Sequence, residues 1–502
     1  MSTVGRNIAA NFAGQLWSAL MGVVFIPAYI HLLGLESFGL IGFFLTLQAL
    51  ALVFDLGMAA TINREIARAG AWRMQETRDL VRTLEWIYWP LGTLVALVIW
   101  LCSDLLAQSW LRPVDIDSGR VGFSIALMAL AIGAQWPTSF YAAGLNGLQR
   151  QVQVNALAAT FGTLRGAGVL APLVIVSPTL EVFFYWQATV SALQTLACAF
   201  VFWGALPPAD RAPRFSVAEF SRVGGFTAGL SAIGMLSFIL IQADRIILSR
   251  LLSLDKFGVY VLAASVAAAL MRLVLPWFSA FYPRFSQLLA QERSAALQSV
   301  YHASCQCLAA TVLPAAAVTA VYSEDLLRLW TGDLLLAKQA APLLAVLICG
   351  TALNGLLHLP YAMQLAYGWT SLALWANLVG VCFLLPSIWL LALTFGSIGA
   401  ASAWVLLNIG YVLVVIPLMH RRILRGQLAD WYFRDVGLPA LASIAAVLAL
   451  DALGPPIREG VEGVITLIAI YATATAAACA VCSSVRRYAW TLLGALVGGI
   501  QR

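Results

Sequence analysis

Long apolar blocks recur along the whole chain, and each is close to the length of one bilayer crossing. A hydrocarbon core needs about 20 consecutive apolar residues in a helix to cross it. The apolar stretch 490–500 is too short for that and is expected to lie at the membrane interface. The longer blocks predict about fourteen transmembrane helices, over residues 8–31, 38–60, 84–107, 121–145, 154–177, 182–204, 224–248, 257–281, 299–323, 339–362, 370–394, 398–419, 436–453 and 462–482.

The chain also carries a weak internal repeat with an offset of 219 residues. The stretch 32–40 (LLGLESFGL) matches 251–259 (LLSLDKFGV), and each copy leads into a predicted helix. An even number of helices per repeat gives both copies the same orientation, so the repeat is parallel, with its axis along the membrane normal. We therefore expect an all-α polytopic membrane protein with an N-lobe over 1–210 (helices 1–6), a C-lobe over 211–425 (helices 7–12) and two C-terminal helices over 426–502.

Basic residues in the short loops predict the orientation of the chain. Lys and Arg concentrate in cytoplasmic loops, and here 19 of them fall in one alternating set of loops against 7 in the other. Both termini are therefore expected to be cytoplasmic. The first apolar stretch, Ile8 to Ile30, spans 23 residues, which exceeds the roughly 7–15 residues of a signal-peptide core, so it is interpreted as a retained helix.

The composition agrees with a polytopic membrane protein, and the loop lengths favour a transporter over an enzyme. Hydrophobic residues make up 61% of the 502 residues and charged residues only 10%, whereas soluble domains carry about 25% charged residues. The short loops offer no extramembrane portion for the acidic groups of a glycosyltransferase or polymerase, so we expect a transporter and not an enzyme. The eight cysteines lie within apolar blocks or at their ends, as small buried hydrophobes do, and neither a metal nor a cofactor is expected.

Two arginines inside predicted helices are the first candidate functional groups. An ionisable side chain at the bilayer centre costs about 2.5–3.5 kcal/mol on insertion scales. Arg165 lies near the middle of the fifth helix, and Arg272 lies in the eighth. Because a guanidinium offers paired donors that match a phosphate group, these residues predict a cationic cavity between the lobes. The structural alternative for each is an ion pair or a cap on a neighbouring helix.

Two carboxylates are candidates for coupling transport to an ion. Asp55 lies in the second predicted helix, and Asp244 lies near the outer end of the seventh, beside Arg245. A low-dielectric site favours the neutral form of a carboxyl group, so proton binding there can be linked to a conformational change. The alternatives are structural, and for Asp55 the expected partner would be Arg64 or an adjacent helix.

Neutral polar side chains within the predicted spans indicate a wet interior. Asn11 and Gln15 are four residues apart and share one face of the first helix. With Gln135 they are candidate contacts for a sugar, although helix–helix hydrogen bonds use the same groups. Further polar residues that fall within or at the ends of the spans are Gln48, Gln187, Gln194, Gln242, Asn354, His358, Gln364, Asn377 and Asn408.

Several short stretches resemble a known family across both lobes. They are GLESFGL at 34–40, FDLG at 54–57 followed by Arg64, GLNGLQR at 144–150, QADRIILS at 242–249 and FGVY at 257–260. These stretches resemble the Wzx-type O-antigen and polysaccharide flippases of the multidrug/oligosaccharidyl-lipid/polysaccharide (MOP) exporter superfamily. The same superfamily also contains lipid II flippases and multidrug antiporters.

This resemblance implies the flipping of an undecaprenyl-diphosphate-linked oligosaccharide by alternating access. The movement would run from the cytoplasmic to the periplasmic leaflet of a bacterial inner membrane, driven by a proton or sodium ion gradient. The diphosphate would be the anion that Arg165 and Arg272 contact. Membrane lipid and other polysaccharide-assembly membrane proteins are the further expected partners, and no nucleic acid is expected.

Alternative functions differ in the residues that they require. A lipid II flippase of the same superfamily stays open as an alternative. A multidrug antiporter usually needs acidic cavity residues for organic cations, whereas the interior basic residues here at least match the acidic ones. A membrane polymerase or ligase would require a long periplasmic loop that carries catalytic groups, and the loop lengths argue against it.

Overall fold

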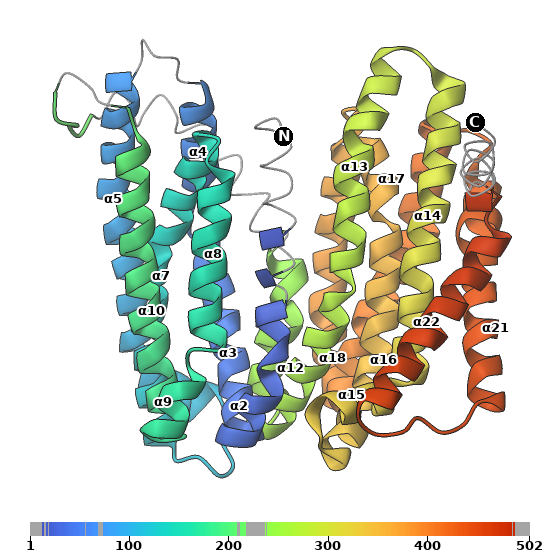
Figure 1. Ribbon diagram of the computed structural model, residues 1–502. Coiled ribbons are helices and arrows are strands. Elements are labelled where there is room, and N and C mark those ends of the chain that lie inside the picture. The colour runs from blue at the N-terminus through green and yellow to red at the C-terminus, as the bar shows by residue number, and fades with distance from the viewer. Residues whose placement is uncertain are drawn as a thin grey trace, which may run out of the picture. The chain divides into compact units, whose positions relative to one another are not determined.

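The computed structural model describes residues 13–14, 17–18, 20–55, 57–68, 74–207, 211–216, 236, 238–483 and 485–486, and the regular secondary structure within these ranges is entirely helical. Eleven of the described helices are long and apolar enough to cross a membrane. The predicted all-α polytopic class is confirmed, whereas the count of fourteen stays a prediction. The chain divides into two compact units, 1–258 and 259–502 (Figure 1).

In the first unit, α7 (Ser118–Gly147) packs against α10, α5 and α4. Its buried side chains include Trp136, Phe140 and Tyr141. Asp117 caps the start of α7 by accepting from the amides of Gly119 and Arg120. The other helices of this unit include α2 (Ile26–Leu33), α3 (Leu35–Val53), α4 (Met58–Arg68), α5 (Met74–Leu101), α8 (Gln151–Gly166), α10 (Leu180–Ala205), the helical stretch 238–251 and the start of α12 (Leu254–Ala269).

The two copies of the repeat begin helices at equivalent positions. Helix α3 starts at Leu35 and α12 starts at Leu254. In the first copy, the buried Glu36 carboxylate accepts hydrogen bonds from the amides of Val114 (2.6 Å), Asp115 (2.9 Å) and Ile116 (3.2 Å). Glu36 therefore fixes the loop that leads into α7.

The second unit is built around α14 (Ser294–Val321), which packs against α13, α16, α21 and α22. Buried residues of α14, α21 and α22, including Val318, Val447 and Ala474, form one apolar cluster. Helix α13 (Met271–Ala290) precedes α14. The α-helices of seven or more residues that follow α14 are α15 (Ser323–Thr331), α16 (Leu334–Leu356), α17 (His358–Ala366), α18 (Ser371–Gly410), α19 (Ile416–Arg422), α21 (Leu438–Leu453) and α22 (Val461–Val481).

Helix α18 is interrupted at Gly396, whose φ of 61° and ψ of −144° are not helical. A glycine adopts this conformation without the steric cost that a side chain would bring. The interruption falls between the predicted spans 370–394 and 398–419. Residues 211–216 and 238–258 belong to the first unit, and the predicted lobe limits at 210 and 425 stay a prediction.

Candidate functional site

Arg165 is held by polar groups of a neighbouring helix. Its Nη2 donates to Gln194 Oε1 at 2.5 Å and to Ser191 Oγ at 3.3 Å, both on α10. The Gln187 side chain donates in turn to the Arg165 carbonyl oxygen at 3.3 Å. The Arg165 Nε is buried and has no hydrogen-bond partner among the described residues. These contacts favour a role in joining α8 to α10, and a contact with substrate stays a prediction.

Of the three predicted sugar-contacting residues in the first unit, the structure describes only Gln135. Asn11 and Gln15 lie outside the described residues. Gln135 on α7 accepts a hydrogen bond from the side chain of Gln48 on α3. This pairing is the helix–helix alternative that the sequence left open, and the role of Gln135 toward a sugar stays a prediction.

Asp55 lies between α3 and α4 and is surrounded by neutral donors. The Tyr88 hydroxyl of α5 donates to Asp55 Oδ1, and its oxygen lies 2.7 Å from Ser139 Oγ of α7. The Ala59 amide approaches Asp55 Oδ2 at 3.4 Å. Arg64, the partner considered from sequence, instead pairs with Glu65 at 2.9 Å. No described cationic side chain forms an ion pair with Asp55.

Asp244 lies in the helical stretch 238–251 of the first unit, where it is partly buried. It takes part in polar interactions with its surroundings. Its predicted role in ion coupling remains a prediction. Among the described residues no group of three or more His, Cys, Asp or Glu side chains is placed to hold a metal ion.

Arg272 differs from Arg165 in its surroundings. It is the second residue of α13, directly after the turn at Leu270 that separates α12 from α13. In the continuous apolar span Leu254–Ala290, 18 residues precede it and 18 follow it. Its side chain is exposed and makes no hydrogen bond or ion pair with any residue that the structure describes. Charged groups at this depth face a cavity or the bundle interior and not lipid.

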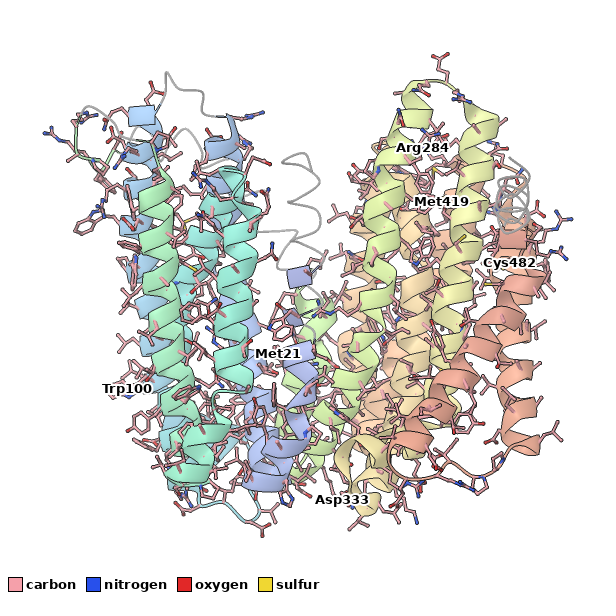
Figure 2. All side chains as sticks on the ribbon, viewed as in Figure 1. Met21, Trp100, Arg284, Asp333, Met419 and Cys482 are labelled. Atoms are coloured by element: carbon pink, nitrogen blue, oxygen red, sulfur yellow. The ribbon has the colours of Figure 1, made fainter. Side chains whose placement is uncertain are left out.

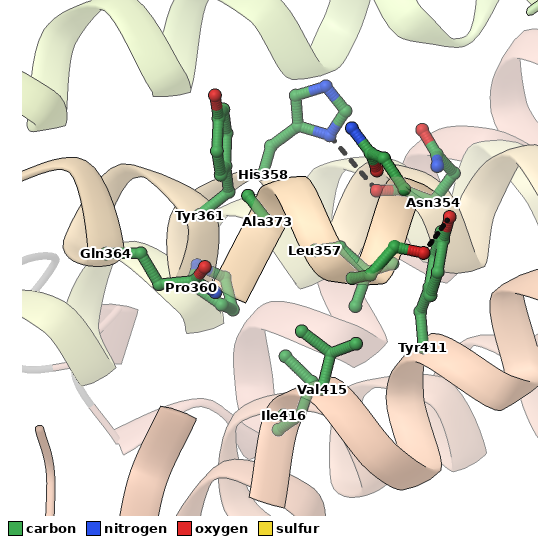
Figure 3. Close-up of a pocket in the computed structure, with 12 residues that line it drawn as sticks. Asn354, Leu357, His358, Pro360, Tyr361, Gln364, Ala373, Tyr411, Val415 and Ile416 are labelled. Atoms are coloured by element: carbon green, nitrogen blue, oxygen red, sulfur yellow. Dashed lines mark hydrogen bonds between the residues drawn. The ribbon is translucent and has the colours of Figure 1, made fainter. Parts of the chain in front are cut away.

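A pocket of about 170 Å³ lies within the second unit (Figure 3). Its polar walls come from four consecutive elements: Asn354 from α16, His358, Tyr361 and Gln364 from α17, Asn377 from α18, and Tyr411 from the π-helical turn Tyr411–Val415. Three interruptions allow these groups to come together: at Leu357 between α16 and α17, at 367–370 between α17 and α18, and at Gly396 within α18.

Hydrogen bonds hold two of the residues that line this pocket, Asn354 and His358. Asn354 Nδ2 donates to Asn408 Oδ1 at 2.9 Å, and Asn408 is fully buried. The His358 Nδ1 lies 3.0 Å from the Asn354 carbonyl oxygen. The sequence placed these residues in membrane spans without predicting that they line one pocket. The i, i+4 spacing of Asn354 and His358 on one helical face was the available signal.

Comparison with known proteins identifies the family. Residues 4–289 match the family model described as "Polysaccharide biosynthesis protein". The chain belongs to this family. A relative from Shigella flexneri, the "Putative O-antigen transporter", is 21% identical over 399 residues, which are 80% of this chain and 93% of the relative. The resemblance to Wzx-type flippases that the motifs indicated is confirmed.

Two solved structures share the fold. The lipid II flippase MurJ in an inward closed conformation has a TM-score of 0.61 at 13% identity, covering 94% of this chain and 97% of MurJ. An inward-facing MATE transporter of the MOP superfamily has a TM-score of 0.60 at 15% identity, covering 83% of this chain and 94% of the transporter. The chain is a polytopic membrane protein of the polysaccharide biosynthesis family, and the transporters and flippases that it resembles agree with the expectation of a transporter and not an enzyme.

Proposed function

We propose that this protein flips an undecaprenyl-diphosphate-linked oligosaccharide, an O-antigen or other polysaccharide repeat unit, from the cytoplasmic to the periplasmic leaflet. Both termini lie in the cytoplasm in this proposal, and the N-lobe and C-lobe alternate access to the substrate. The diphosphate contacts Arg272 while the lipid tail stays in the bilayer. A proton or sodium ion gradient drives the cycle through Asp55.

The exposed Arg272 at mid-span is the observation that carries the proposal. Its guanidinium has no partner among the described residues, whereas charged side chains within membrane spans almost always pair with another group or face a water-filled cavity. An anionic headgroup would supply the missing partner, and the planar guanidinium is suited to paired hydrogen bonds with phosphate oxygens. The family match and the O-antigen relative support a saccharide as the remainder of the substrate.

The Asp55 site supports the ion-coupling part of the proposal. A carboxyl group with only neutral donors around it has no cation to balance its negative charge when it is ionised. A proton or a sodium ion would neutralise it, and the network that joins Asp55, Tyr88 and Ser139 would pass the change to α5 and α7. Asp55 also lies in the break between two helices, where a local rearrangement disrupts few backbone hydrogen bonds.

The experiment replaces Arg272 and compares it with a second arginine of the same helix. Arg284 is exposed near the far end of α13 and donates to Gln287 at 2.7 Å (Figure 2). In cells that lack the chromosomal gene, Arg272→Ala should abolish surface polysaccharide at normal membrane levels of the protein. Arg272→Lys should restore it partly, because Lys keeps the charge but loses the paired donors, and Arg284→Ala should behave as wild type.

Normal polysaccharide in the Arg272→Ala variant would overturn the role of Arg272. The lipid II alternative predicts a different rescue, because a lipid II flippase would restore growth in cells depleted of their own. Rescue of growth without rescue of surface polysaccharide would replace the proposed substrate with lipid II.

A further inference from the structure

The pocket in the second unit carries hydrogen-bonding groups but no acid, Lys or Arg on its walls. An organic cation would be matched by carboxylates, and a phosphate by basic side chains. A purely lipidic occupant would need no ring of amides and hydroxyls. The wall chemistry, with the side chains of Asn354, Gln364 and Asn377 beside Tyr361 and Tyr411, suits an uncharged ligand with many hydroxyl groups.

Gln364 points independently to a ligand. Its side chain is only 3% exposed and lines the pocket, and its Oε1 has no hydrogen-bond partner among the described residues. A buried acceptor without a partner costs about 1–3 kcal/mol. Asn377 also makes no hydrogen bond with a described residue. Two amides of one pocket are therefore available to a ligand.

Aromatic rings border the same pocket. Tyr361 lies nearly parallel to Phe278 of α13, with ring centroids 6.1 Å apart, and it is 39% exposed. Tyr411 packs against α18 because residue 380 is glycine. A Cβ at this position would clash with the ring and hydroxyl of Tyr411. Tyrosine rings combine a large apolar face with a polar tip, and such a face can cover the C–H surface of a sugar ring.

The pocket is linked to Arg272 through α13. Phe278 packs against both His358 and Tyr361, and it follows Arg272 by six residues on the same helix, a rise of about 9 Å. The pocket volume of about 170 Å³ is several times the ~30 Å³ share of one water molecule. A diphosphate at Arg272 would thus bring its first attached sugar within reach of the pocket.

We propose that this pocket is a sugar subsite that binds an uncharged pyranose ring of the lipid-linked substrate through Gln364, Asn377 and Tyr361. The inference rests on the proposed function and adds the residues that select the saccharide. Arg272 would bind every undecaprenyl diphosphate, whereas the pocket would distinguish those that carry a sugar.

The test measures binding of three probes to the full chain in nanodiscs by native mass spectrometry. The probes are undecaprenyl diphosphate alone, the same lipid bearing one N-acetylglucosamine, and the same lipid bearing one galactose. Wild type should prefer at least one sugar-bearing probe over the bare lipid. Gln364→Leu and Asn377→Leu should each reduce that preference about threefold to tenfold, the equivalent of one hydrogen bond, without weakening binding of the bare lipid.

Two controls separate this result from misfolding. Gln287→Leu makes the same chemical change on the exposed face of α13 and should leave all three affinities unchanged. Gln364→Leu should also leave the thermal midpoint unchanged or raise it, because it removes a buried amide whose oxygen has no partner.

The outcomes distinguish the subsite from the function on which it rests. Equal loss of bare and sugar-bearing probes in the pocket variants, or an unchanged preference, would overturn the subsite while flipping stands. A wild-type chain with no preference for either sugar would overturn it as well. Failure of wild type to bind any of the three lipids would overturn the proposed function together with the subsite.

Discussion

Gly39 and Gly258, which hold the same position in the two copies of the repeat, pack directly against each other. A Cβ on Gly39 would lie 3.2 Å from the Gly258 nitrogen, and a Cβ on Gly258 would lie 3.2 Å from the Gly39 nitrogen. The carbonyl oxygens of Leu254 and Leu35 would lie closer still, at 2.2 and 2.6 Å respectively. Helices α3 and α12 therefore cross at backbone contact, in the way that small residues permit in membranes.

This reciprocal contact predicts equal effects from two distant substitutions. Gly39→Ala and Gly258→Ala should each force α3 and α12 apart and destabilise the protein by about 1–3 kcal/mol, as overpacking does, seen as a lower thermal midpoint in detergent. Gly204→Ala is the matched control, because a Cβ on this exposed α10 glycine meets nothing within 4 Å. A fall for only one of the two glycine variants would contradict the symmetric crossing.

The Asp55 network predicts a pH phenotype that two variants separate. Asp55→Asn cannot change its charge, so transport should be slow and its pH dependence should flatten. Tyr88→Phe keeps the carboxyl group but removes its hydroxyl donor, so the pH dependence should persist with a shifted midpoint. Assays of lipid-linked oligosaccharide flipping in proteoliposomes across a pH series measure both. Tyr185→Phe on the exposed face of α10 is the control, and wild-type pH behaviour in Asp55→Asn would remove Asp55 from the coupling.

The hydrophobic pattern predicted the all-helical membrane class and some helix limits, because hydrophobicity is a local property of the chain. The predicted boundary between 394 and 398 coincides with the non-helical Gly396, and the repeat predicted equivalent helix starts at Leu35 and Leu254. Partners depend instead on tertiary structure. For Asp55 the sequence offered Arg64 or an adjacent helix as the structural partner, and the structure places Tyr88 of α5 there, 33 residues away. The pocket likewise depends on tertiary structure, because the helices are interrupted at Leu357 and at 367–370 between Asn354 and Asn377, and at Gly396 before Tyr411.

Arg165 is predicted to stabilise the protein through its hydrogen bonds to α10. Arg165→Gln should lower the thermal midpoint, because hydrogen bonds to a charged group contribute about 1.5–3 kcal/mol each. In a double-mutant cycle, Arg165→Gln and Gln194→Leu should show coupling of at least about 0.5 kcal/mol, as residues in direct contact do. Arg150→Gln, at an exposed position before α8, is the control. If Arg165→Gln abolished transport without lowering the thermal midpoint, and the cycle showed no coupling to Gln194, Arg165 would instead act by contacting the substrate.

A buried polar network ties the C-terminal helices to α14. His302 Nδ1 lies 2.5 Å from Asp435 Oδ2, and Gln306 Nε2 donates to Asp435 Oδ1 at 2.9 Å. Asp435 belongs to the π-helical stretch Trp431–Gly437 that precedes α21, and it is 1% exposed. The His302 Nε2 reaches Gln427 Oε1 at 3.0 Å, so this one histidine contacts both ends of the segment that connects α19 to α21.

Replacing Asp435 alone should therefore destabilise the protein more than replacing both Asp435 and its partner His302. Asp435→Leu leaves the His302 ring and the Gln306 amide buried without their acceptor, and loss of one member of a buried pair costs about 3–5 kcal/mol. The combined His302→Leu and Asp435→Leu variant replaces both members with apolar groups and should recover part of that loss. Thermal unfolding measures the recovery, and proteolysis in the loop 454–460, which separates α21 from α22, reports whether these helices loosen. A double variant less stable than the sum of both single changes would show that the pair is not the main link between α14 and the C-terminal helices.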